Sequence, residues 1–263
     1  MGLIGYLIYF NTVKSDDFIN SPYNTRQDTF SDRVVRGSIL SSDGEVLAQT
    51  NVSEDGTEER SYPYGNTFAH VVGYDTNGKS GLESEANFQL LSSHEFFLNQ
   101  IRNEFMGTKN TGDSVVSTLS ADLQTTAYNS LGDRRGAVVA LEPSTGRILA
   151  MVSKPDFDPN TISENWDSLV NDETNSSLLN RATMGQYPPG STFKVVTALD
   201  YFRTHGSFNG FSFDCQGSIT KEEHTIQCYN GNVHGTEDFI RHLPIPATVP
   251  LLRSVQNSAV HLC

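Results

Sequence analysis

The chain has 263 residues, of which 31 are acidic and 18 basic, so its formal net charge at pH 7 is −13. A chain this acidic offers no basic face that would neutralise phosphates, which argues against a nucleic-acid partner and against charge-driven binding to anionic lipid. A hydrophobic fraction of 37% and a charged fraction of 19% are those of an ordinary globular protein, long enough for one large domain or two smaller ones.

The first ten residues, MGLIGYLIYF, carry no charge. A membrane-crossing helix needs about 20 apolar residues, so this segment is too short to cross a bilayer by itself. We interpret residues 1–10 as the outer end of a transmembrane anchor whose beginning is missing; a short buried strand is the alternative. Residues 11–32 are polar and rich in turn formers, and they are expected to form a juxtamembrane connector.

Residues 33–112 are predicted to form a β-rich domain. Asp43-Gly44 stands between two short apolar runs, which is a strong hairpin signal. Residues 69–74, AHVVGY, have the composition of a strand, and the stretch that follows Gly81 has a more helical pattern.

A second region begins at Asp113. SVVSTL, residues 114–119, alternates as a strand does, and Ser120 is a good N-cap for a helix that continues through Ala127. Residues 136–155 predict another hairpin, with its turn at Pro143-Ser-Thr-Gly146. Residues 156–180, rich in Asp, Asn and Ser, are predicted to be a long polar loop.

Ser191-Thr-Phe-Lys194 carries the strongest chemical signal. A serine hydroxyl is a weak nucleophile until a base takes its proton. On a helix, residues three apart share a face, so the amine of Lys194 can reach the hydroxyl of Ser191. To act as a base at neutral pH, the lysine must have its pKa lowered by burial or by nearby positive charge.

The S-x-x-K pattern alone is weak, because Ser218-Ile-Thr-Lys221 repeats it. Ser191 differs in its context. It follows Pro188-Pro189-Gly190 and precedes Val195, Val196, Leu199 and Phe202, which predict the apolar stripe of a buried helix. Free N–H groups at the start of such a helix favour a developing oxyanion. Ser218 has no such helix behind it and is predicted to be a turn residue.

Neither a metal nor a cofactor is predicted. The three cysteines make no disulfide framework and have no zinc spacing. Cys215 and Cys228 lie thirteen residues apart and can bridge if the domain is extracytoplasmic, and two core thiols are the alternative. His94-Glu95 lacks the second histidine that a zinc protease helix needs.

Several segments together resemble the class B penicillin-binding proteins. Tyr187-Pro-Pro-Gly-Ser-Thr-Phe-Lys194 is similar to their nucleophile motif, and Arg181 stands just upstream as it does in that family. Residues 142–160 resemble the segment that leads toward the nucleophile. Arg36-Gly-Ser-Ile-Leu, residues 43–48 and Gly81-Leu-Glu83 resemble motifs of the non-catalytic pedestal domain. The match runs from about Asn20 to Asp238.

The resemblance implies an α+β fold, with a β-rich pedestal at 33–112 and the first part of a transpeptidase domain at 113–238. It also implies that Ser191 attacks the penultimate D-alanine of a peptidoglycan stem peptide, with Lys194 as general base. The acyl group then passes to an amine on a neighbouring strand, and β-lactams acylate the same serine. Implied partners are stem peptides, β-lactams, the bacterial membrane and proteins of cell division or elongation, with the catalytic part outside the cytoplasm.

The sequence departs from this family after Asp238. No K-T-G follows Ser191, and the proline-rich residues 239–263 stand where the family's S-x-N helix is expected. We interpret this tail as out of frame: after one lost base near Phe239, the hidden frame across residues 243–251 can read Ala-Tyr-Ser-Cys-Asn-Ser-Ala-Phe. A truly divergent tail is the rival reading. Because it lacks both motifs, this chain is expected to be inactive itself.

Two other functions remain open. A serine β-lactamase or D,D-carboxypeptidase shares the S-x-x-K chemistry but passes the acyl group to water. A non-catalytic scaffold would use residues 30–110 to bind cell-wall synthesis proteins. The segment before Asp113 and the apolar start both favour the transpeptidase.

Overall fold

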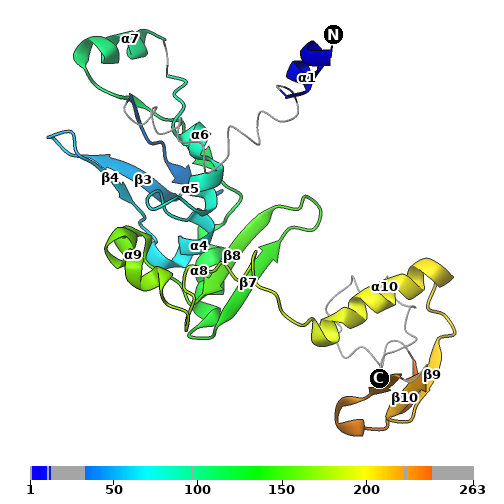
Figure 1. Cartoon of the computed structure of the whole chain (residues 1–263). Coiled ribbons are helices and arrows are strands. Elements are labelled where there is room, and N and C mark those ends of the chain that lie inside the picture. The colour runs from blue at the N-terminus through cyan, green and yellow to red at the C-terminus, as the bar shows by residue number, and fades with distance from the viewer. Residues whose placement is uncertain (1, 11, 13–32, 96, 222–223, 239–263) are drawn as a thin grey trace. The chain divides into compact units, whose positions relative to one another are not determined.

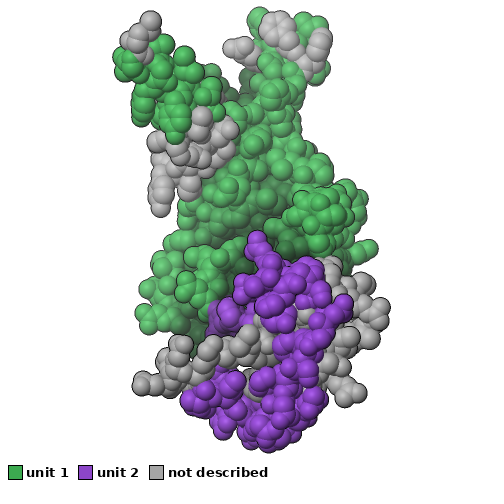
Figure 2. All heavy atoms as spheres, turned by 90° about the vertical axis from the view of Figure 1, so that its right-hand side faces the viewer, with its two compact units in different colours: residues 1–186 green, residues 187–263 purple. Residues whose placement is uncertain are grey.

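A computed structural model describes residues 2–10, 12, 33–95, 97–221 and 224–238. The chain forms two compact units, Met1–Gln186 and Tyr187–Cys263, which are coloured separately in Figure 2 and are described one at a time. The predicted out-of-frame tail and, apart from residue 12, the predicted connector lie outside the described residues.

The apolar start of the chain is a helix, α1 (Gly2–Tyr9), with exposed side chains such as Leu3 and Ile4. The alternative of a buried strand is therefore wrong for this segment. Among the helices of the described residues, none has both the length and the apolar character needed to cross a membrane.

The main sheet of unit 1 has four strands in the order β4-β3-β2-β6. The predicted hairpin at Asp43-Gly44 is confirmed, because β2 and β3 are antiparallel and Gly44 has a φ of +90°. β4 continues the sheet antiparallel to β3, and β6 joins β2 in parallel. A separate parallel pair joins β1 to β5. The strands are β1 (Val34–Val35), β2 (Ile39–Leu40), β3 (Val46–Val52), β4 (Glu58–Ser61), β5 (Asn110–Thr111) and β6 (Val115–Val116).

Two glycines, Gly37 and Gly112, allow backbone segments of this domain that are far apart in the sequence to pass very close to each other. A Cβ on Gly37 would lie 2.0 Å from the carbonyl oxygen of Asp113, and a Cβ on Gly112 would lie 2.0 Å from that of Leu90. Gly37 N–H donates to Leu90 O at 2.9 Å, so the close approach is also a hydrogen-bonded one. Any side chain at either position would separate the two segments.

Short helices connect the strands of unit 1. They are η3 (Gly65–Phe68), α4 (Ala69–Val72), α5 (Gly81–Glu85), α6 (Asn87–Leu90) and α7 (Phe97–Met106). The helical prediction after Gly81 is confirmed, but the strand predicted at 69–74 is wrong. Ala69 and His70 are both buried, whereas a strand with one buried face would alternate. Gly73, at a φ of +86°, ends this helical turn.

A buried ionic cluster ties the motif residues of this domain together. The Glu83 carboxylate is fully buried and accepts from Arg36 Nε at 2.7 Å and from Arg60 Nε at 2.8 Å, while the two arginine side chains are only 9% and 5% exposed. Arg60 also donates to Gly37 O at 2.7 Å, and Arg36 to Asn87 Oδ1 at 2.5 Å. The two pedestal motifs that contain Arg36 and Glu83 are thus in direct contact.

A cavity of about 320 Å³ lies against this cluster, and Arg36, Arg60, Asp75 and Lys79 are among the residues that line it. Burial, and secondarily the charge of Glu83, raises the pKa of the Asp75 carboxyl above its ordinary value. Asp75 also accepts a hydrogen bond from Tyr62 at 3.3 Å.

The next part of unit 1 packs a helix on a hairpin: α8 (Ala121–Leu131), β7 (Gly136–Leu141) and β8 (Ile148–Lys154). Both were predicted and both are confirmed, including the Ser120 cap, whose side chain accepts from Leu123 N–H at 3.4 Å. The fully buried Gln124 joins the layers. Its amide donates to Thr67 O and Met151 O, and its oxygen accepts from Met151 N–H, each at 2.8 Å. Figure 1 shows α8 and α4 beside β8.

The loop predicted at 156–180 is wrong in part, because the structure has a 3-10 turn, η4 (Pro159–Thr161), and a helix, α9 (Ile162–Val170). Ile162, Trp166 and Leu169 recur at helical spacing and pack around Phe157 and Ala69. Asn160 joins this segment to the pedestal by accepting from Tyr62 N–H at 2.9 Å and donating to Tyr62 O at 3.1 Å.

The described residues of unit 2 form one α-helix, two 3-10 turns and two separate two-stranded sheets. Its elements are η5 (Gly190–Thr192), α10 (Phe193–His205), β9 (Ser212–Cys215), β10 (Ser218–Lys221), β11 (His224–Gln227), η6 (Tyr229–Gly231) and β12 (Gly235–Asp238). β9 pairs antiparallel with β12, and β10 pairs antiparallel with β11. The second sheet is therefore an excursion between β9 and β12.

Candidate active site

Ser191 lies in a 3-10 turn that leads directly into α10. Gly190 has a φ of +54°, a conformation that a residue with a side chain rarely adopts, so glycine is required at this entry. Thr192 closes the turn: its N–H and its hydroxyl both donate to Pro189 O, at 3.2 and 2.5 Å. The backbone thus places Ser191 one helical turn before Lys194, which stands in the first turn of α10.

The sequence predicts that Ser191 and Lys194 act as a pair. Residues three apart on continuous helical turns lie on one side of the helix. The first N–H groups of α10 have no partner within their own helix, and the positive end of the helix dipole lies there. A serine at this position is therefore placed where developing negative charge is favoured.

The expectation that α10 is a buried core helix is wrong for the described residues. Val195, Val196 and Leu199 are all exposed, Val196 by 54%, and Ala198 is the buried residue of this helix. α10 is instead anchored at its far end. The ring of Tyr201 stacks on His205 with centroids 3.8 Å apart and meets Phe211 edge-on at 5.7 Å. Gly206, left-handed at a φ of +73°, ends the helix.

Arg181 organises the segment upstream of the nucleophile turn within unit 1. Its side chain donates to three carbonyl oxygens: Asn175 at 2.5 Å, Ser176 at 3.2 Å and Leu179 at 3.4 Å. Its backbone N–H donates to Ser153 Oγ at 2.9 Å, which fastens the segment to β8. Arg181 therefore holds a loop in shape.

The second S-x-x-K copy lies on a strand. Ser218 begins β10 rather than a turn, which corrects that prediction, and Ser218 and Lys221 are three apart in a strand. A strand lacks the helical geometry that brings residues three apart onto one face, so this copy does not have the context of Ser191. A Ser-x-Asn also occurs at Ser207-Phe-Asn209, which sequence analysis missed. There Asn209 N–H donates to Ser207 Oγ at 3.0 Å, as in a local turn after α10.

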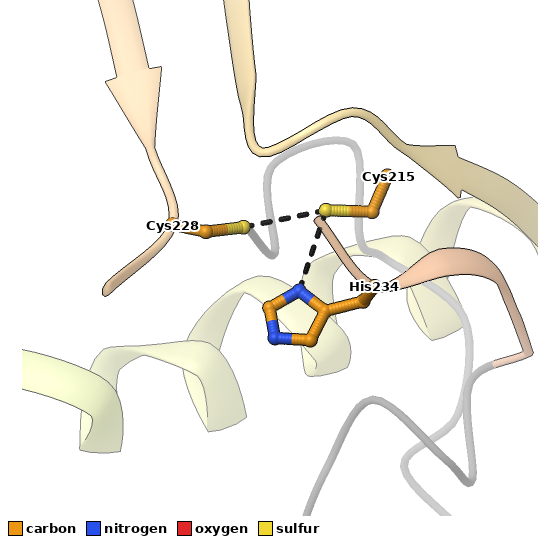
Figure 3. Close-up of side chains that lie close together, drawn as sticks. All are labelled: Cys215, Cys228 and His234. Carbon is orange, nitrogen blue, oxygen red and sulfur yellow. Dashed lines mark hydrogen bonds between the residues drawn. The ribbon is translucent and has the colours of Figure 1, made fainter. Parts of the chain in front are cut away.

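Sequence analysis also missed a cluster of sulfur and nitrogen atoms. Cys215 Sγ lies 3.3 Å from Cys228 Sγ and 3.4 Å from His234 Nδ1, and Figure 3 shows the three side chains turned toward one another. All three ligand atoms lie within 4.8 Å of one another, so this is where the described residues could hold a metal ion. The spacing gave little signal, because each residue comes from the end of a different strand.

Comparison with known proteins identifies two consecutive segments. Residues 36–115 match the penicillin binding protein A dimerisation domain, and residues 136–239 match the penicillin binding protein transpeptidase domain. The second match includes the turn at Ser191 and Lys194. The chain belongs to the class B penicillin-binding proteins, as the sequence motifs predicted, and members of this family are peptidoglycan D,D-transpeptidases.

Three known proteins are similar to this chain. It is 41% identical over 180 residues to peptidoglycan D,D-transpeptidase PbpA of Mycolicibacterium smegmatis, an alignment that covers 62% of this chain and 36% of that protein. Penicillin-binding protein A of M. tuberculosis, solved as a ceftriaxone acyl-enzyme, aligns with a TM-score of 0.69 and 29% identity over 81% of this chain and 52% of that one. PBP2 of Helicobacter pylori, solved in complex with MreC, shares the fold with a TM-score of 0.63 at 18% identity, over 78% and 58% of the two chains. The chain thus spans about a third of the PbpA sequence that it matches.

Proposed function

We propose that this protein is a peptidoglycan D,D-transpeptidase in which Ser191 is the nucleophile and Lys194 the general base. The observation that carries the proposal is the turn at Gly190–Thr192 leading into α10, inside the segment that matches the transpeptidase domain. Lys194 takes the hydroxyl proton while Ser191 Oγ attacks the carbonyl of the penultimate D-alanine. The bond to the terminal D-alanine breaks, and that D-alanine leaves with a proton on its new amine.

The resulting acyl-enzyme reacts with an amine of a second stem peptide. This restores the serine hydroxyl and forms the cross-link. A β-lactam acylates the same oxygen through its strained amide, as the acyl-enzyme of the M. tuberculosis relative illustrates for that protein. The substrate would lie outside the cytoplasm, and we place this chain there, held at the membrane through an N-terminal anchor.

The pedestal at residues 33–112 is proposed to bind a cell-wall synthesis protein. The support is the H. pylori relative, which was solved in complex with MreC. A protein that only scaffolds would keep such binding while ignoring β-lactams, which separates the scaffold alternative from the enzyme.

The test of the catalytic roles uses a chimera in which residues 1–238 precede the corresponding C-terminal part of M. smegmatis PbpA. Fluorescent penicillin should label it stoichiometrically, and tryptic mapping should place the adduct on Ser191. Ser191→Ala should abolish labelling, and Lys194→Met should slow it by about 10²–10⁴-fold. Ser218→Ala is the matched control and should label as the parent does.

Two results would reject the assignment: persistent labelling of Ser191→Ala, or loss of labelling with Ser218→Ala. Rapid release of the adduct to water would favour the β-lactamase or carboxypeptidase alternative. The 263-residue polypeptide, which has no K-T-G after Ser191, is expected to label far more slowly than the chimera.

A further inference from the structure

The helix α7 of unit 1 turns its polar side, rather than its apolar side, toward the rest of its domain. Gln100 Nε2 donates to Glu95 O at 2.9 Å. Asn103 Nδ2 donates to Glu95 Oε2 at 3.3 Å and to Asn110 Oδ1 at 3.0 Å. A surface helix of a globular protein normally packs its apolar stripe on the core and exposes its polar residues. α7 has the opposite orientation.

The apolar residues of α7 form a stripe on its outer side. Leu98, Ile101 and Phe105 follow one another at spacings of three and four residues, which places them on one face of the helix. Phe105 is 89% exposed and Leu98 is 61% exposed, while Ile101 is half-buried. Met106, next to Phe105, is 63% exposed. We call these four residues the α7 stripe. Large apolar side chains gathered in one exposed patch mark a contact with an apolar surface.

α7 is fastened to the place where the chain enters the domain. Glu95 Oε1 accepts from Thr111 N–H at 3.0 Å, and Thr111 belongs to β5, which pairs with β1. Asn110 N–H donates to Arg33 O at 3.1 Å, and Arg33 directly follows the predicted juxtamembrane connector at residues 11–32. A segment of that length spans roughly 75 Å at most, even when fully extended. An anchor at residues 1–10 therefore keeps α7 close to a membrane. Figure 1 shows α7 at the end of unit 1 opposite β7 and α9.

The small size of the α7 stripe favours a lipid surface over a second copy of the chain. A stable protein interface buries about 800 Å² on each partner and uses about 20–30 residues a side, whereas the stripe offers four. A lipid surface needs less, because a chain that is already anchored meets the membrane at a high effective concentration. Interfacial helices bury their apolar side about 5–10 Å deep at the boundary between headgroups and acyl chains.

We propose that α7 lies on the outer surface of the membrane, with Leu98, Phe105 and Met106 inserted among the lipids and its polar side still bonded to the domain. This inference rests on the membrane anchor and the extracytoplasmic location proposed above. The contact is apolar, so it requires no anionic lipid and agrees with the net charge of −13. With the N-terminal anchor it gives the pedestal a second attachment to the membrane and so limits its orientation there.

The test uses the full chain with Phe105→Trp and Trp166→Phe, which leaves a single tryptophan, on the α7 stripe. A hexahistidine tag before Met1 attaches the chain to phosphatidylcholine vesicles that carry nickel-chelating lipid, so attachment does not require the proposed anchor. Compared with plain vesicles, vesicles with brominated acyl chains should quench the tryptophan emission, at low and at high salt alike. The tagged parent, whose Trp166 packs in the α9 cluster, is the matched control and should not be quenched.

A second variant separates lipid contact from an effect of the new tryptophan. Leu98→Asp in the Phe105→Trp background should lower the quenched fraction about tenfold or more, because the membrane no longer gains a buried leucine. Leu98 is exposed, so the thermal midpoint of unit 1 should stay the same. In the unsubstituted chain, hydrogen exchange of residues 98–106 should slow on the vesicles.

Unquenched emission from the tethered Phe105→Trp chain would overturn the inference. Exchange at residues 98–106 that slows with protein concentration in the absence of lipid would assign the stripe to a second copy of the chain and would overturn it too. If the untagged chain fails to bind vesicles while the tagged chain is quenched, the proposed anchor is wrong and the lipid contact of α7 stands.

Discussion

The two units of the chain are stabilised in different ways. Unit 1 buries polar and charged groups that satisfy one another: Glu83 between two arginines, and Gln124 between a helix and a strand. Among its described residues, unit 2 buries little besides Ala198, Cys215 and Cys228, and one side of α10 is exposed. Among the described residues, those that follow the candidate nucleophile are thus less buried than those of the pedestal, which is held by interactions that tolerate few substitutions.

The buried charge pairs of unit 1 affect how this unit unfolds. Burial of matched charges fixes one geometry, since removing either partner leaves an uncompensated charge in a low-dielectric interior. Unit 1 is therefore expected to unfold as a cooperative body. The single tryptophan, Trp166, packs in its α9 cluster, so tryptophan emission reports on this unit selectively.

The largest predicted effect tests the ionic cluster. Glu83→Gln removes the charge that both guanidinium groups share, and it should lower the unfolding free energy of unit 1 by about 3–5 kcal/mol. Denaturant unfolding followed by Trp166 emission measures it. Glu142→Gln is the control: Glu142 pairs with Arg147 at 3.0 Å on the surface, and its loss should leave the midpoint unchanged. If the two variants had equal midpoints, the buried ionic cluster would not stabilise unit 1 as the comparison between the units assumes.

An intermediate effect is expected at the joint between α8 and β8. Gln124→Leu keeps the approximate volume but removes the side-chain partner of Thr67 O, Met151 O and Met151 N–H, the last two of which are buried; this should cost about 2–4 kcal/mol. The counterpart in unit 2 is the exposed Gln216, which donates to Asp214 at 2.6 Å. Gln216→Leu should leave the Trp166 transition where it is. A mild effect of Gln124→Leu would mean that polar satisfaction matters less in unit 1 than the structure implies.

The smallest predicted effect is a pH dependence from His70. This ring is buried, and its Nε2–H donates to Pro155 O at 3.2 Å. Burial lowers its pKa below the ordinary 6.5, an effect only partly opposed by that hydrogen bond and by Asp156. The unfolded chain therefore binds a proton that the folded chain excludes, so unit 1 loses stability as pH falls below about 6.5.

His70→Gln should flatten this loss between pH 7.5 and pH 5, as measured by Trp166 unfolding midpoints. His205→Gln, which alters an exposed ring in unit 2, should keep the wild-type slope. A parallel slope in both variants would assign the pH dependence to other groups.

Local signals in the sequence predicted much of unit 1. Asp43-Gly44, Pro143 to Gly146 and Ser120 each fix a turn or a cap through their own chemistry, and the structure confirms all three. The strand predicted at 69–74 failed because tertiary burial overrode the β-branched composition. The helix α9 was missed because its polar residues hid the spacing of Ile162 and Trp166.

In the candidate site, too, the features set by local sequence could be predicted, and those set by tertiary neighbours could not. The turn at Gly190 and the serine-lysine spacing are local and could be predicted. The exposure of Val196 and the meeting of Cys215 with His234 depend on which elements lie beside one another, and neither period nor spacing carries that information. Arg60 was missed for this reason too, because its carboxylate partner stands 23 residues away.

The close approach of Gly37 and Gly112 lies just before the parallel pair β2–β6, which joins an early segment of the domain to a late one. This pairing affects the order in which the domain can fold. The β2–β3–β4 meander can form as soon as residue 61 has been synthesised, but β2 finds its parallel neighbour β6 only when residues 115 and 116 have been made. Closing that long loop is slow compared with hairpin formation. Until then the inner edge of β2 is an open strand edge, the kind of surface that pairs with other chains. A ribosome paused between residues 61 and 115 would therefore hold this domain in its most aggregation-prone form.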